Sequence, residues 1–126
     1  MQNPDIARLF DEVADLVEIK DEDPFRVRAY RNAARTVRDF PDAIADWVRS
    51  ARDLTEIPGI GDDLAEKIST LVTTGELPLR TQLLAKLPSG LLDLLRIPGL
   101  GPKRVKQLYS KLKIKSAADL AKALDE

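Results

Sequence analysis

A five-residue phrase occurs twice in this chain, forty positions apart. It reads IPGIG at residues 57–61 and IPGLG at residues 97–101. Each copy is followed by a segment with helical spacing of its apolar residues, DDLAEKI in the first and PKRVKQL in the second. Glycine has no Cβ, so it permits positive φ angles and lets another backbone approach closely. The repeat therefore predicts two tight turns, each leading directly into a helix.

This arrangement is typical of a helix-hairpin-helix, a backbone device that binds nucleic-acid phosphates. The first N–H groups of a helix have no partner within it and lie at the positive end of its dipole, which makes an anion site. One G-x-G is weak evidence, whereas two copies with the same lead-in are strong. The turn residues predicted to contact phosphate are Gly59, Ile60, Gly61, Gly99, Leu100 and Gly101.

The composition narrows the possible chemistry. The chain has 126 residues, 44% hydrophobic and 33% charged, which fits one folded domain or two very small ones. Cysteine and histidine are absent, which excludes disulfides, thiol catalysis and the usual zinc ligands. No apolar run approaches the roughly 18 residues of a membrane span, and no signal peptide is visible. We therefore expect a cytoplasmic protein without membrane contacts.

The net charge of −1 hides a strong segregation of charge along the chain. Residues 1–23 carry two basic and eight acidic side chains, and residues 24–41 carry five arginines against one aspartate. Residues 42–79 carry three basic and eight acidic groups, and residues 80–126 carry ten basic and four acidic groups. Alternating blocks of this kind predict one face that attracts an anion while the rest repels it.

Helical periodicity dominates throughout, and no segment alternates like a strand. The sequence predicts an all-α, compact helical bundle with two helix-hairpin-helix motifs. Residues 1–76 are expected to form an N-terminal helical domain with the first motif, and residues 77–126 a smaller subdomain with the second. The acidic stretch at residues 20–23 is predicted to be a loop. Predicted helix boundaries include an N-cap at Asn3, starts at Pro24, Pro41 and Pro102, a stop at Gly75 and an N-cap at Ser116.

Basic side chains are concentrated beside the predicted anion sites. Lys103, Arg104 and Lys106 surround the helix start after the second turn, whereas Asp62 and Asp63 follow the first. Carboxylates stabilise a helix N-terminus but compete with an incoming phosphate. We therefore expect the first hairpin to bind more weakly, or to need a cation.

The second predicted helix carries an arginine stripe. Four arginines fall within an arc of about 80° at 100° per residue, with Tyr30 on the opposite, core-facing side. One interpretation is phosphate binding, because guanidinium groups bind phosphate oxygens bidentately. The other is a solvated face paired with acidic neighbours. The stripe consists of Arg28, Arg31, Arg35 and Arg38.

Lys67 is the candidate nucleophile in a chain that is otherwise poor in reactive groups. A lysine amine attacks an aldehyde only in its neutral form, so it needs desolvation or a cationic neighbour. The alternative is a surface lysine paired with Asp63, four residues earlier on the same helix. The spacing favours this ion pair.

With these motifs in place, the chain resembles the N-terminal region of a bacterial family X DNA polymerase, related to the lyase domain of DNA polymerase beta. The resemblance covers essentially the whole chain and rests on residues 3–10 (NPDIARLF), residues 23–36 (DPFRVRAYRNAART) and both hairpins. It implies that Arg26 and Tyr30 line a 5′-phosphate pocket and that Lys67 forms the Schiff base with 5′-deoxyribose phosphate. A second pocket lysine of the beta enzyme falls on Asp63, which weakens phosphate capture here.

The resemblance also implies ligands and partners. Family members hold a sodium or potassium ion at each hairpin through backbone carbonyls, and no tightly bound cofactor is expected. The DNA would be gapped, nicked or 5′-phosphorylated, with a polymerase core in cis if the chain is a fragment, in the nucleoid of a bacterial cytoplasm. The corresponding carbonyls belong to Thr55, Ile57, Ile60, Leu95, Ile97 and Leu100.

The leading functional hypothesis is a sequence-independent DNA-binding module for gapped or nicked repair intermediates in base excision repair. One alternative is a 5′-deoxyribose phosphate lyase that acts through Lys67. Another is a protein-interaction scaffold of a structure-specific nuclease. The polymerase chemistry of the family lies in later domains, so the chain alone is not expected to polymerise DNA.

Overall fold

The computed structural model describes residues 1–20 and 23–125, and every regular element among them is helical. This confirms the predicted all-α fold with two helix-hairpin-helix motifs. Asp21 and Glu22 of the predicted acidic loop lie outside the described residues. The elements are α1 (Asn3–Ile19), α2 (Pro24–Asp39), α3 (Ile44–Arg49), the 3₁₀ helix η1 (Leu54–Glu56), α4 (Asp62–Thr74), α5 (Pro78–Lys86), α6 (Gly90–Leu95), α7 (Pro102–Leu112) and α8 (Ala117–Asp125).

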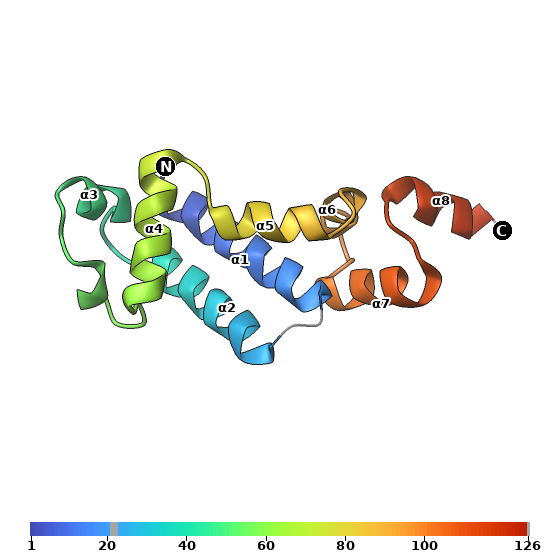
Figure 1. Cartoon of the computed structure of the whole chain (residues 1–126), viewed down its shortest axis with the longest axis horizontal. Helices are drawn as coiled ribbons and strands as arrows, with labels where there is room; N and C mark the ends of the chain where they lie inside the picture. The colour runs from blue at the N-terminus through green and yellow to red at the C-terminus, as the bar shows by residue number, and fades with distance from the viewer. Residues whose placement is uncertain (21–22, 126) are drawn as a thin grey trace.

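Helix α1 is the central element of the molecule (Figure 1). It packs along α2 and α5, and it also contacts α7. Helices α3 and α4 lie at one end, and α6, α7 and α8 lie at the other (Figure 1). The two hairpins therefore lie at opposite ends of a bundle whose central helix is α1. No helix among the described residues combines the length and the hydropathy needed to span a membrane.

The larger core is built on the apolar stripe of α1. Ile6, Phe10 and Val13 on this stripe are each 0% exposed, as the i, i+3, i+4, i+7 spacing predicts. Phe10 stacks on Tyr30 of α2 with ring centroids 6.2 Å apart. Ile57 and Ile60 of the first hairpin belong to the same cluster. The first hairpin is therefore anchored in the main core.

A second, smaller core lies under the second hairpin. Its buried members are Ile19, Leu91, Leu94, Val105 and Ile114. Because Ile19 is the last residue of α1, this core is attached to the central helix. Leu77 and Leu83, on the far side of the predicted 76/77 boundary, pack in the larger core. Residues on both sides of position 76 thus pack in the same core. The division into two units at this position stays a prediction.

The backbone of α6 touches the segment that precedes α8. A Cβ added to Gly90 would lie 2.3 Å from the carbonyl oxygen of Lys115 and 2.6 Å from the Cβ of Ser116. Only a glycine permits this approach. Ser116 in turn caps α8 as predicted, since its Oγ accepts the N–H of Asp119 at 3.1 Å.

Two predicted helix starts are wrong by a few residues, for one reason. The N-cap of α1 is Gln2 rather than Asn3, and α3 begins at Ile44 rather than Pro41. The Asn3 side chain instead reaches the α2–α3 connection. Its Oδ1 accepts the N–H of Ile44 at 2.9 Å, and its Nδ2 donates to the carbonyl of Asp42 at 2.8 Å. The Asn3 side chain thus makes long-range hydrogen bonds, while the start of α1 is capped locally by Asp5, whose Oδ2 accepts the N–H of Gln2 at 3.0 Å.

Candidate nucleic-acid interface

Each hairpin contains the same hydrogen-bonded β-turn. In the first, the N–H of Ile60 donates to the carbonyl of Ile57 at 3.0 Å, and Gly59 has a φ of 94°. In the second, the N–H of Leu100 donates to the carbonyl of Ile97 at 3.1 Å, and Gly99 has a φ of 87°. Proline at the second turn position and a positive-φ glycine at the third define a type II turn. The first glycine of each phrase is therefore required by the turn itself.

The second glycine of each phrase has no such requirement. Gly61 has a φ of −91° and Gly101 a φ of −85°, both ordinary extended values. A Cβ added at either residue would meet no heavy atom within 4 Å. These glycines are the N-cap residues of α4 and α7, where the unpaired N–H groups lie. Their lack of a side chain leaves these N–H groups open to a molecule approaching from outside.

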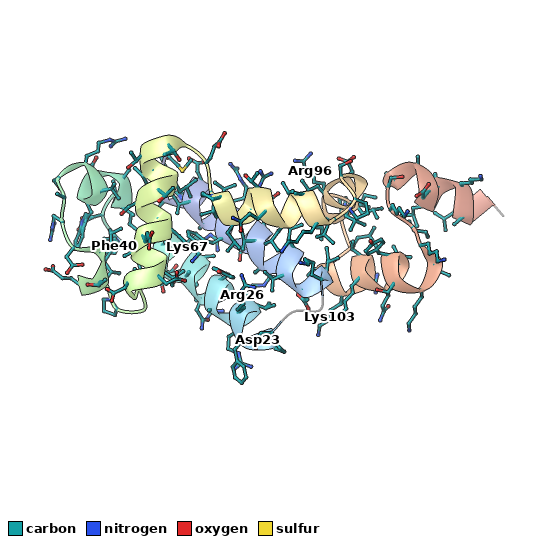
Figure 2. The ribbon with its side chains drawn as sticks, in the orientation of Figure 1. Asp23, Arg26, Phe40, Lys67, Arg96 and Lys103 are labelled. Carbon is teal, nitrogen blue, oxygen red and sulfur yellow. The ribbon has the colours of Figure 1, made fainter. Side chains whose placement is uncertain are left out.

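The two helix starts differ in charge as predicted. Asp62 and Asp63 occupy the first turn of α4 and are exposed, whereas Lys103 and Arg104 are exposed in the first turn of α7. Figure 2 shows Lys103 at the start of α7. The Nη1 of Arg104 donates to the carbonyl of Gly99 at 3.4 Å, so this guanidinium lies against the turn. Lys106 follows and is half-buried.

The arginine stripe of α2 is divided between two roles. Arg31 forms ion pairs with Asp15, Asp11 and Glu18 of α1, and Arg38 pairs with Asp11 at 3.0 Å. For these two arginines the geometry favours the ion-pair interpretation over phosphate binding. The acidic α1 and the basic α2 thus neutralise each other where they meet.

Burial under this ion-pair network affects Asp15. It raises the pKa of the Asp15 carboxyl above its ordinary value of 3.8, and the hydrogen bond and charge of Arg31 oppose this rise. The ion pairs of Arg31 and Arg38 therefore join α1 to α2 and partly bury Asp15 between them.

The other arginines of α2 point elsewhere. Arg28 and Arg35 are exposed, and neither has a carboxylate partner within the described part of the chain. Arg26 is half-buried, and its guanidinium lies 5.9 Å from the ring centroid of Tyr30 (Figure 2 labels Arg26). Tyr30 itself is only 5% exposed. Arg28 and Arg35 are thus available to a phosphate, whereas Tyr30 offers little surface to one.

The candidate nucleophile Lys67 lies on α4 (Figure 2). Its Nζ donates to Asp63 Oδ1 at 2.6 Å, the i, i+4 ion pair that the spacing favours. The side chain is 23% exposed and lines a hollow of about 310 Å³ together with Glu66, Thr70 and Gln82. The carboxylate of Asp63 pairs with the ammonium form, whereas Schiff-base formation requires the neutral amine.

Of the six carbonyls predicted to hold a monovalent cation, those of Thr55 and Leu95 suit that role, whereas those of Ile57 and Ile97 accept the turn hydrogen bonds from Ile60 and Leu100. The residue three positions after Thr55 is Pro58, and the residue three positions after Leu95 is Pro98. Proline has no N–H, so neither carbonyl receives the usual i+3 hydrogen bond. Neutral oxygen ligands match a hard cation. Cation binding stays a prediction. The described residues contain no cluster of three or more acidic side chains that could hold a metal ion.

The sequence motifs do not single out one further candidate, an exposed aromatic residue. Phe25, the second residue of α2, is 72% exposed. On a helical wheel it lies about 100° from the buried stripe of Tyr30, Ala33 and Val37. That angular offset was the available signal, and it predicts an exposed aromatic ring.

Comparison with known proteins gives matches over the whole chain. The helix-hairpin-helix domain family matches residues 1–77, and the SAM-like helix-hairpin-helix tandem family matches residues 91–126. The DNA polymerase/3′-5′ exonuclease PolX of Bacillus subtilis (strain 168) is 30% identical over 126 residues. The alignment covers 100% of this chain and 21% of that protein, in its N-terminal part. The chain thus spans about a fifth of the length of this relative.

Proposed function

The chain belongs to the helix-hairpin-helix domain family, and on this basis we propose that it binds gapped or nicked DNA through backbone phosphates. The predicted resemblance to the N-terminal region of a bacterial family X DNA polymerase is confirmed by the similarity to PolX. Both findings point to DNA binding in a polymerase-related protein. A polymerase core in cis and a role in repair are part of the proposal.

The observation that carries the proposal is the pair of N-cap glycines. Gly61 and Gly101 adopt backbone angles open to any residue and have free space around their Cβ positions. The fold by itself does not require glycine there. Glycine is useful at these positions because a DNA backbone can approach the N–H groups at the helix starts without meeting a side chain. Such contacts detect phosphates and not bases, so binding is independent of sequence.

The second hairpin supplies the stronger of the two phosphate sites. Lys103 and Arg104 add positive charge beside the N-terminus of α7. Asp62 and Asp63 oppose a phosphate at α4, and a monovalent cation on the carbonyls of the first turn would offset their charge. Such an ion would supply positive charge beside the first hairpin.

The test is the pair of variants Gly101→Val and Ser110→Val. Valine at residue 101 fits the fold but covers the helix start, so affinity for a 5′-phosphorylated gapped duplex should fall at least tenfold. Ser110 is exposed on the last turn of the same helix, and its variant adds similar bulk away from the site. Fluorescence anisotropy measures affinity, and urea unfolding verifies the fold. Equal affinity of Gly101→Val and wild type would contradict the proposal.

Gap recognition needs a separate comparison. A gapped duplex carrying a 5′-phosphate should bind more tightly than an intact duplex of equal length, and equal affinity would remove gap specificity. The logarithm of the affinity should fall with the logarithm of salt concentration, with a slope of about −0.9 per phosphate neutralised.

The lyase hypothesis has its own decisive measurement. Borohydride reduction traps a lysine Schiff base on an incised abasic duplex. Because Asp63 holds the Lys67 ammonium, we expect no trapped adduct with this chain. An adduct that disappears in Lys67→Ala would instead establish lyase chemistry.

A further inference from the structure

A hollow of about 550 Å³ opens between α1, α5 and α6. Its apolar lining consists of Leu9 from α1 and of Leu92 and Leu95 from α6. All three leucines are half-buried and pack against the larger core, so this lining is held in place from beneath. The volume lies within the range of hollows that hold ligands. We call this site the α1–α6 hollow.

The acidic side chains of the hollow are already neutralised. Glu12 of α1 lies 2.9 Å from Arg80 of α5, and these two side chains are only 21% and 30% exposed. Asp11 and Asp15, which also line the hollow, form ion pairs with the arginines of α2 described above. The three carboxylates therefore present little uncompensated negative charge to a ligand.

Two arginines at the edge of the hollow are bound much more loosely. The guanidinium of Arg8 lies 3.5 Å from Asp5, and that of Arg96 lies 3.8 Å from Asp93, each pair being three residues apart. The two arginine side chains are 74% and 73% exposed. Exposed ion pairs of this kind contribute little to stability. Both arginines can therefore exchange these partners for the carboxylates of another molecule at little cost.

The hollow faces away from the predicted phosphate site of the second hairpin. Although Arg96 directly precedes the phrase at residues 97–101, Figure 2 shows it at the upper edge of the view, whereas Lys103 at the start of α7 lies on the lower side. None of the described residues that line the hollow belongs to either hairpin phrase. We therefore expect that a ligand in the hollow and DNA at the hairpins bind at the same time.

We propose that the α1–α6 hollow is a docking site for an acidic peptide segment of a partner protein, in which a bulky apolar side chain lies between carboxylates. The apolar side chain packs on the three leucines, and the carboxylates pair with Arg8 and Arg96. Guanidinium groups bind carboxylates bidentately, and arginines that flank an apolar anchor site are a recurring means of recognising acidic motifs. A nucleic-acid backbone is also anionic, but it offers no apolar side chain for the leucine lining.

The test uses a fluorescein-labelled peptide of about eight residues, aspartates around a central phenylalanine, which is long enough to span the hollow. Fluorescence anisotropy measures its affinity. Replacing the phenylalanine by serine, or the aspartates by asparagines, should weaken binding about tenfold or more, because each removes one half of the recognition. Addition of a saturating 5′-phosphorylated gapped duplex should leave the affinity for the parent peptide unchanged.

A charge-reversal variant locates the site. Arg96→Glu should weaken binding of the peptide about tenfold. Arg49→Glu is the matched control, since Arg49 is an exposed arginine on α3 that also pairs with an aspartate three residues earlier, far from the hollow. Urea unfolding verifies the fold of both variants. Backbone amide shifts on titration with the peptide should be concentrated at residues 8–12 and 92–96.

Four outcomes would overturn the docking site. They are equal losses in Arg96→Glu and Arg49→Glu, equal affinity for the phenylalanine and serine peptides, displacement of the peptide by the gapped duplex, and no binding of the parent peptide at about 1 mM. Displacement by the duplex would place the peptide at the phosphate sites instead. Loss of the docking site would leave DNA binding by the hairpins intact, because the two surfaces share no lining residue among those described.

Discussion

The two hairpins contain the same type of turn but differ in how deeply they are packed in the core. In the first, Ile57 and Ile60 are each 4% exposed, and Gly59 lies against Thr36 of α2. In the second, Leu100 is only half-buried, and a Cβ on Gly99 would meet nothing within 4 Å. The first hairpin is thus part of the main core, whereas Ile97 and Leu100 of the second pack on a smaller cluster with five buried members. A sequence repeat therefore preserves the turn without preserving its surroundings.

The difference in burial accompanies a difference in charge. The deeply anchored hairpin carries Asp62 and Asp63 at its helix start, and the lightly anchored one carries Lys103 and Arg104. We infer a division of roles: the first hairpin organises the fold beside α2, and the second provides the main phosphate site.

Equivalent core positions in the two repeats should differ in their contribution to stability. Ile68 of α4 is 0% exposed, and Leu108 of α7, forty positions later, is half-buried. We expect Ile68→Ala to lower the free energy of unfolding by about 2–5 kcal/mol, because it leaves a cavity in the larger core. Leu108→Ala should cost about 1 kcal/mol. Urea unfolding measures both values, and equal losses would mean that the two hairpins are equally well anchored.

Gly90, which lies outside both hairpin phrases, should matter more for stability than the N-cap glycine Gly61. Gly90→Ala places a Cβ 2.3 Å from the Lys115 carbonyl, so it should lower the free energy of unfolding by about 1–3 kcal/mol. Gly61→Ala, at an N-cap with open space, should lower it by no more than about 1 kcal/mol, the cost of losing a favoured N-cap residue. Hydrogen exchange should show faster opening at residues 113–120 in Gly90→Ala alone. The reverse order of stabilities would contradict this close approach.

Exchanging charges between the two helix starts should reverse their relative strengths. Lys103→Asp should weaken binding of a 5′-phosphorylated gapped duplex about tenfold and make the salt slope shallower by about 0.9. Asp63→Lys, at the equivalent position of the first hairpin, should strengthen binding. Glu76→Lys makes the same change in net charge at an exposed site between α4 and α5, so it separates local from global electrostatics. The division of roles fails if all three variants change affinity only in proportion to net charge.

The smallest effect is a dependence of stability on pH at the α1–α2 interface. Burial raises the pKa of Asp15, so the native state binds this proton more tightly than the unfolded state. The stability gained from protonation is complete below the ordinary value of 3.8 and is lost as pH rises through the raised value. Relative to Asp15→Asn, the wild type should therefore become more stable as pH falls from about 7. Urea unfolding of both proteins across this pH range measures the difference, and a difference that does not change with pH would contradict a raised pKa for Asp15.

Much of the fold and part of the site were predictable from sequence, because their causes are local. Helix α7 begins at Pro102, as the proline predicts. The Lys67–Asp63 pair follows from i, i+4 geometry on one helix. Asn3 shows where prediction from local sequence fails. The sequence pattern predicted an N-cap there, but the side chain forms hydrogen bonds with residues about forty positions away. The partners of Arg31 were equally inaccessible, because they lie on another helix.

The sequence by itself determined the two turns, because an Ile-Pro-Gly phrase has few conformations open to it. It also determined that each turn is followed by free N–H groups, because every helix start has them. It also determined which helix start is basic and which is acidic. Only the tertiary structure decided that Gly61 and Gly101 are free of internal constraint, because this depends on the absence of neighbours from other elements. Packing of α1 against α2 likewise decided which arginines are neutralised and which remain exposed. Local sequence fixes conformation, but the surface left for a partner depends on which faces the core covers.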